Sequence, residues 1–95
     1  MLPPPLTARQ RKQLKQQAFA LKPVVLLGQK GLSPAVLAEI DQALEAHALI
    51  KVKLTGFERS EYADAIARIT EHCRAQAIAR VGRILTLYRE PTNAD

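Results

Sequence analysis

The sequence has few of the residues from which catalytic and metal sites are usually built. It contains one cysteine, two histidines and no tryptophan in 95 residues. A lone cysteine cannot form an internal disulfide, so nothing indicates a secreted, disulfide-held domain. His72 and Cys73 are adjacent, and adjacent side chains on a helix point about 100° apart, which is unsuitable for a spaced pair of metal ligands. We therefore expect no metal, no cofactor and no catalytic residues.

Other signatures are absent as well. No run of about 18 apolar residues occurs, so no membrane span is expected. The opening Met1–Pro5 lacks a basic start and a long apolar stretch, so it is not expected to be a signal peptide. Neither a Gly-x-Ser-x-Gly nucleophile elbow nor a Walker motif occurs. The expectation is a cytoplasmic monomer without membrane association. Cys73 is predicted to be a core residue and His47 to cap a helix end.

Acidic residues are missing from the first 38 positions. That part holds six basic residues and no Asp or Glu, whereas residues 39–95 hold eight basic and nine acidic ones. The net charge of +5 therefore arises in the N-terminal part of the chain. Such clustering is typical of a protein with a polyanionic partner. A solvated helix face is the alternative, but helices selected only for solubility usually mix the two signs.

One stretch combines a strand, a glycine turn and the start of a helix. The four apolar residues Val24–Leu27 predict a short strand buried on both faces. The turn Gly28-Gln29-Lys30-Gly31 follows. Ser33 is then a good N-cap, and Pro34 suits the first helical position because its missing N–H is not needed there. This arrangement points backbone N–H groups and the positive end of a helix dipole outward beside Lys30, which favours phosphate binding.

Periodicity and turn residues together predict three helices and four strands. Thr7 and Gln10 form a capping box at the start of the first helix, and Lys22-Pro23 ends it. The predicted helices are 8–21, 34–47 and 60–74, and the predicted strands are 24–27, 49–55, 77–81 and 84–89. The order α-β-α-β-α-β-β predicts an α/β class fold, a single compact domain with a four-stranded mixed sheet covered by three helices. The first two strands should be parallel and the last two antiparallel.

The domain limits follow from the ends of these elements. Residues 1–6, rich in proline, are expected to be a flexible leader, residues 7–90 the folded domain, and residues 91–95 a frayed tail.

Three blocks of sequence carry a resemblance to a known family. They are Leu21–Ser33, with its Lys-Pro-strand-Gly-x-x-Gly pattern, Leu49–Lys53, and Val81–Arg89, with its Leu-Tyr-Arg ending. On these blocks the chain resembles the CRM domain of the chloroplast RNA splicing and ribosome maturation family, and its length resembles the bacterial YhbY-like members. The resemblance covers residues 7–89. It implies a fold similar to the C-terminal domain of bacterial translation initiation factor three, RNA binding, and association with precursors of the large ribosomal subunit.

The resemblance and the charge pattern together give a set of candidate RNA-binding residues. The family's Gly-x-x-Gly loop, taken to contact the RNA backbone, falls on Gly28–Gly31, and the basic surface of the first helix maps to Arg11, Lys12 and Lys15. The complete predicted set is Arg9, Arg11, Lys12, Lys15, Lys22, Gly28, Gln29, Lys30, Gly31, Ser33, Lys51 and Lys53. For Lys51 and Lys53 a solvent-facing and an RNA-facing role stay open. Both lie on an open sheet face if the helices cover one face only.

The resulting hypothesis is a non-catalytic RNA-binding protein whose partner is ribosomal RNA in large-subunit precursors. A KH domain does not fit, because its Gly-x-x-Gly loop joins two helices, and an RNA recognition motif needs more sheet aromatics than this chain has. Two alternatives remain. One is a protein-interaction module whose basic face docks an acidic partner, and the other is a small enzyme that holds a phosphorylated ligand at a helix N-terminus.

Overall fold

The computed structural model describes residues 6–27 and 31–91. The elements along the chain are α1 (Ala8–Ala18), β1 (Pro23–Leu26), α2 (Pro34–His47), β2 (Leu49–Lys53), a short 3-10 helix η1 (Arg59–Glu61), α3 (Tyr62–Cys73), β3 (Gln76–Val81) and β4 (Ile84–Tyr88). The strands form one sheet in the order β1-β2-β4-β3. β1 is parallel to β2, whereas β4 is antiparallel to both of its neighbours. The predicted element order and mixed α/β sheet are confirmed.

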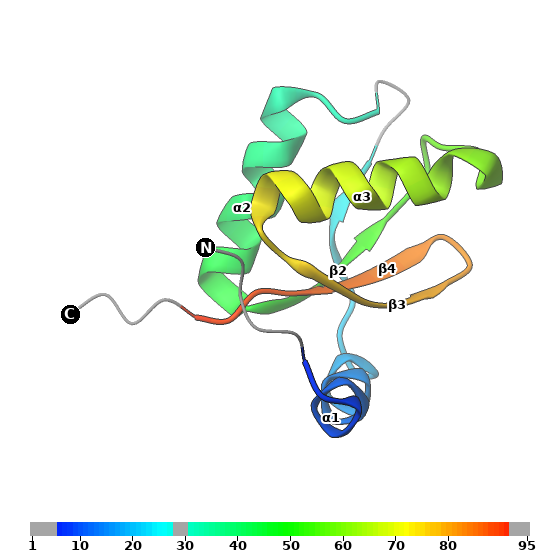
Figure 1. Ribbon diagram of the computed structural model, residues 1–95. Coiled ribbons are helices and arrows are strands. Elements are labelled where there is room, and N and C mark those ends of the chain that lie inside the picture. Colours follow the sequence, from blue (N-terminus) through cyan, green and yellow to red (C-terminus); the bar gives the residue numbers. More distant parts are fainter. Residues whose placement is uncertain (1–5, 28–30, 92–95) are drawn as a thin grey trace.

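The helices lie on both faces of the sheet (Figure 1). α2 and α3 cover one face and enclose the core with it, and α1 crosses the opposite face over β2, β3 and β4. The alternation along β2 follows this division, because Ile50 and Val52 are buried in the core while Lys51 and Lys53 point to the side of α1. The helices therefore do not leave one sheet face open, and the two lysines lie on the face that α1 crosses.

The predicted starts of the first two helices are confirmed by their caps. The Gln10 N–H donates to Thr7 Oγ1 at 3.1 Å, and the Thr7 N–H donates to Gln10 Oε1 at 2.9 Å. At the start of α2 the Val36 N–H donates to Ser33 Oγ at 3.2 Å. α1 ends three residues earlier than predicted, since the chain turns toward β1 after Ala18 and the Leu21 N–H bonds to the Ala18 carbonyl.

The prediction that the first strand is buried on both faces was wrong. β1 begins at Pro23, and its side chains alternate, with Val25 buried while Val24 and Leu26 are 51% and 65% exposed. β1 is an edge strand, and α1 packs over the other three strands. Only its face toward α2 is therefore covered, and its apolar sequence alone could not reveal this.

The other boundaries differ by a few residues. β2 ends at Lys53, before the predicted Thr55, because the Thr55 hydroxyl donates to the Leu27 carbonyl as the chain leaves the sheet. Residues 59–61 form η1 ahead of α3, which ends one residue before the predicted Arg74. Apart from Leu6 and Pro91, the predicted leader and tail lie outside the described residues.

Two predictions about individual side chains have different outcomes. Cys73 is 1% exposed within the core, as predicted. His47 is not the cap, because Ala48 occupies that position with a φ of 63° and donates its N–H to the Leu44 carbonyl at 2.8 Å. His47 is instead the last residue of α2, with an exposed side chain.

Candidate nucleic-acid interface

α1 is fixed to the sheet by its inner surface. Ala18 is 2% exposed, and the Arg11 guanidinium donates to the Ala77 carbonyl of β3 at 3.1 Å. The basic residues Arg9, Lys12 and Lys15 stay exposed. Of the four predicted basic residues on this helix, Arg11 thus holds the helix in place, and the other three present charge to solvent.

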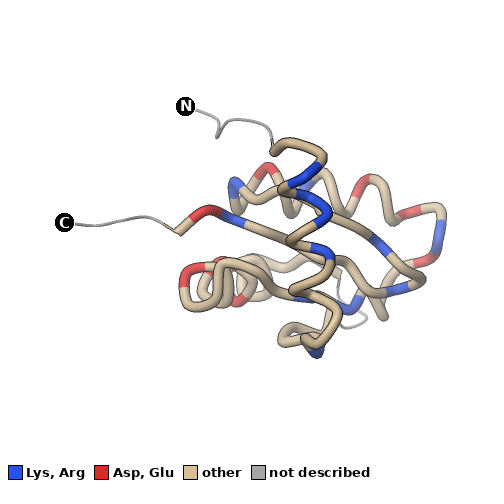
Figure 2. Tube along the Cα trace, turned by 90° about the horizontal axis from the view of Figure 1, so that it is seen from below, with Lys and Arg blue, Asp and Glu red and all other residues tan. Residues whose placement is uncertain are grey.

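The acidic residues are concentrated away from α1 and the strands. α1 and all four strands contain no Asp or Glu, and seven of the nine acidic residues lie between positions 39 and 71, in α2, η1, α3 and the loop before η1. Figure 2 views the molecule with α1 in front, and Lys and Arg follow that helix while the acidic positions lie around the periphery. We call this side the basic face and define it by Arg9, Lys12, Lys15, Lys22, Lys51 and Lys53.

The sheet contributes two of these lysines. In the ladder with β4, Lys51 lies opposite Thr86 and Lys53 opposite Ile84. Lys51 and Lys15 line the same hollow of about 220 Å³, between the C-terminal end of α1 and the strands beneath it. The structure therefore brings together a helix lysine and a strand lysine that are distant in sequence, and a phosphate could contact both.

No carboxylate neutralises the basic face in the described part of the chain. Both ion pairs found there belong to Arg89, which contacts Asp41 Oδ1 at 2.5 Å and Glu45 Oε2 at 3.1 Å. Arg89 also donates to the Cys73 carbonyl at 3.0 Å. Although it belongs to the Leu-Tyr-Arg block, Arg89 is therefore a structural link between the end of β4, α2 and α3. The ion pairs of the described residues therefore do not involve the basic face.

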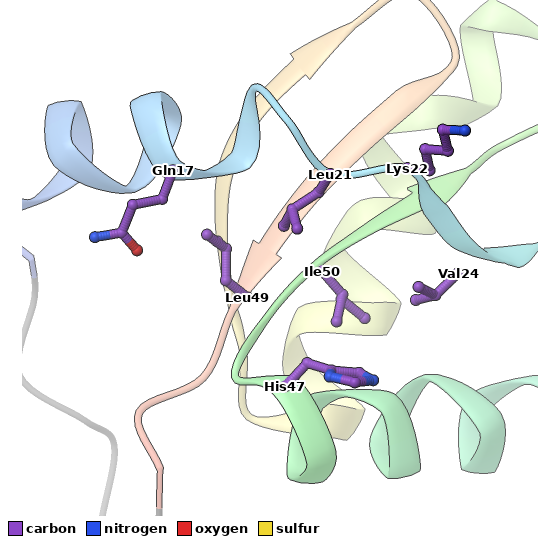
Figure 3. Close-up of a pocket in the computed structure, with 7 residues that line it drawn as sticks. All are labelled: Gln17, Leu21, Lys22, Val24, His47, Leu49 and Ile50. Carbon is purple, nitrogen blue, oxygen red and sulfur yellow. The ribbon is translucent and has the colours of Figure 1, made fainter.

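A second hollow, of about 490 Å³, lies where the chain passes from α1 into β1 (Figure 3). Leu21, Val24 and Leu49 supply apolar walls, and Lys22 and His47 lie at its margin. Apolar walls with a few polar groups are typical of small-molecule and base pockets. The sequence predicted Lys22 as an RNA-binding residue but gave no sign of the hollow, because its lining comes from four separate elements.

The glycine turn is described only at its C-terminal end. The predicted contacts of Gly28, Gln29 and Lys30 lie outside the described residues. Gly31 has a φ of 69°, in the left-handed region that side chains rarely adopt, and a Cβ there would lie 3.6 Å from the Phe57 ring. Ser33 caps α2, whose first turn has no acidic residue, so the positive end of the helix dipole is not offset locally.

These observations define a small α/β domain with one basic face, to which α1 and the strands of the described chain contribute no acidic side chain. Residues 6–89 match the model of the CRS1/YhbY (CRM) domain, and the chain belongs to that family. The family prediction is confirmed. Among the described residues, no helix combines the length and apolarity that crossing a membrane requires.

Two relatives support the family assignment, and a solved structure has the same fold. An RNA-binding protein of Haemophilus influenzae is 43% identical over 89 residues, which is 94% of this chain and 90% of that protein. A Pseudomonas aeruginosa protein named "Probable RNA-binding protein" is 36% identical over 85 residues, 90% of this chain and 82% of its own. The solution structure of a hypothetical protein from Staphylococcus aureus has the same fold, with a TM-score of 0.81 at 24% identity over 96% of this chain and 95% of its own.

Proposed function

We propose that this protein is a non-catalytic RNA-binding protein that acts on ribosomal RNA of large-subunit precursors. The observation that carries the proposal is the basic face, which has six lysine and arginine side chains and no acidic residue on α1 or on any strand. The similarity of the chain to proteins named as RNA-binding supports RNA as the polyanionic partner. The ribosomal target is what the family resemblance implies.

The basic face would bind the sugar-phosphate backbone. Lys15 and Lys51 share one hollow, which is suited to a phosphate, and Arg9, Lys12, Lys22 and Lys53 extend the positive surface around it. Phosphate contacts position a nucleic acid but carry no sequence information, so we expect modest base specificity from these residues alone.

The glycine turn would add a second phosphate contact. Gly28 and Gly31 would let the backbone approach the RNA closely, with Gln29 and Lys30 beside it. Ser33 holds the start of α2 in shape, and the helix dipole would favour an anion there.

A salt titration tests the electrostatic part of the proposal. If about six basic side chains engage single-stranded RNA, log affinity should fall against log salt with a slope near −4. Lys12→Ala should weaken binding and make the slope shallower by about 0.7. Arg68→Ala is the matched control, because it removes the same charge from an exposed position on α3, on the opposite side of the sheet. Equal effects of the two variants, or a flat salt dependence, would count against the basic face.

A second experiment addresses the RNA. A lysate should be sedimented with and without RNase, and the protein should follow large-subunit particles only in the untreated sample. If the partner were an acidic protein, the complex would instead persist after nuclease treatment in a pull-down. Turnover of a phosphorylated compound, or a tight complex with a mononucleotide, would favour the enzyme alternative.

A further inference from the structure

The exposed apolar side chains of the described molecule gather on the same side as its lysines. Five large hydrophobic residues are more than a third exposed, and all belong to the end of α1, the following linker, β1 or the end of β3: Phe19, Leu21, Val24, Leu26 and Val81. α2 and α3 contribute none. Isolated apolar residues are normal on a protein surface, but a group on one face indicates a binding surface.

Phe19 is the largest and most exposed of the five. Its side chain is 87% exposed, so the domain gains little packing from it. It follows α1 directly, and its N–H bonds to the Gln16 carbonyl at 3.3 Å. The aromatic ring borders the hollow that Lys15, Lys51 and Val81 also line. An exposed aromatic residue therefore shares one hollow with two lysines, and none of the described residues that line this hollow is acidic.

We propose that Phe19 is a stacking platform for an unpaired RNA base, with the flanking phosphates held by Lys15 and Lys51. This inference rests on the proposed function and deepens it, since it names unpaired rather than duplex RNA as the ligand of this hollow. Aromatic rings stack on any base, so the contact tolerates different sequences. Bases within a duplex are already stacked on one another and cannot cover the ring.

The charge around the ring selects this occupant over an apolar protein segment. A protein segment that covered Phe19 and Val81 would bring Lys15 and Lys51 against its backbone without supplying negative charge. A single RNA strand supplies an apolar base face and a phosphate on each side of it. The ring of Phe19 thus matches the base, and Lys15 and Lys51 match the two phosphates beside it.

Three substitutions at one position test the proposal. Phe19→Ala should weaken binding of an unstructured single-stranded RNA about tenfold, the size of effect expected when one base–aromatic stack is lost. Binding of a perfect RNA duplex of equal length should stay unchanged. Phe19→Tyr should bind single-stranded RNA like the parent protein because it keeps the ring. Phe19→Leu should bind it as weakly as Phe19→Ala because it keeps apolar bulk without a ring.

A control variant separates base stacking from a general loss of exposed apolar surface. Leu26→Ala removes another exposed apolar side chain from the same side, outside this hollow, and should leave both affinities unchanged. All variants should melt like the parent protein, since Phe19 and Leu26 are exposed.

The outcomes distinguish the stacking site from the proposed function. Parental affinity in Phe19→Leu, or an equal loss on single-stranded and duplex RNA in Phe19→Ala, would overturn the stacking site. The proposed function would survive that result, provided the parent protein shows salt-dependent RNA binding. Failure of the parent protein to bind either RNA would overturn both.

Discussion

The guanidinium of Arg11 and the backbone carbonyl of Ala77 are joined by a hydrogen bond of 3.1 Å that ties α1 to β3 across 66 positions of sequence. This contact changes how one of the predicted RNA-binding residues is understood. A charged donor bonded to the protein's own backbone positions the helix, whereas the neighbouring Arg9, Lys12 and Lys15 are exposed.

Arg11→Ala should therefore destabilise the fold. The carbonyl of Ala77 would lose a charged, half-buried donor, and hydrogen bonds to charged groups contribute about 1.5–3 kcal/mol. We expect a lower free energy of unfolding by roughly that amount in urea denaturation. Lys12→Ala, one position along and exposed, should leave the unfolding free energy within about 0.5 kcal/mol of the parent value. An unfolding curve for Arg11→Ala equal to that of the parent protein would show that this hydrogen bond does not contribute to stability.

Arg89→Ala should also lower stability, by about 1–3 kcal/mol, because it leaves the Cys73 carbonyl without its partner and breaks contacts to Asp41 and Glu45. The carboxylates are exposed, so most of the loss should come from the carbonyl bond and should persist in high salt. Thermal melts at low and high salt measure this. A loss that vanishes in high salt would instead assign the stabilisation to the ion pairs. RNA affinity, measured where the variant is fully folded, should change no more than in Arg68→Ala.

Gly31→Ala should cost about 1–2 kcal/mol of folding free energy, because an L-residue is strained at the positive φ of this position. The Cβ would meet the Phe57 ring at 3.6 Å, an ordinary contact, so the strain lies in the backbone. Gly31→Asn should cost less, since asparagine tolerates the left-handed region better than alanine. Denaturation of the three proteins gives the ranking, and equal stability of the Ala and Asn variants would contradict it.

Cys73 predicts a pH dependence of stability. Burial raises the pKa of its thiol above the usual value, so the folded protein keeps the proton where the unfolded chain releases it. The unfolding free energy should therefore fall as the pH rises above about 8.5, where an unfolded cysteine ionises. Cys73→Ala lacks this thiol, so its stability should decline less between neutral and alkaline pH. Parallel curves for the two proteins would show that the thiol contributes nothing.

Local sequence patterns determined most of the secondary structure correctly. Ser33 and Pro34 fixed the start of α2, and the predicted helix 34–47 has the observed bounds, because caps act within one turn of the chain. The alternation along β2 correctly separated Ile50 and Val52 from Lys51 and Lys53. The prediction that Val24–Leu27 is buried on both faces failed, since an apolar run does not reveal whether its strand lies at the centre or at the edge of a sheet.

The sequence by itself determined the family, the order of the elements and the concentration of positive charge in the first 38 residues. Only the tertiary structure decided that α1 crosses the face of the sheet opposite α2 and α3, so that Lys51 joins Lys15 while Arg11 and Arg89 are held by the protein's own groups. The physical reason is that periodicity reports which residues share one side of their own element. Which partner covers that side depends on contacts between segments far apart in the chain.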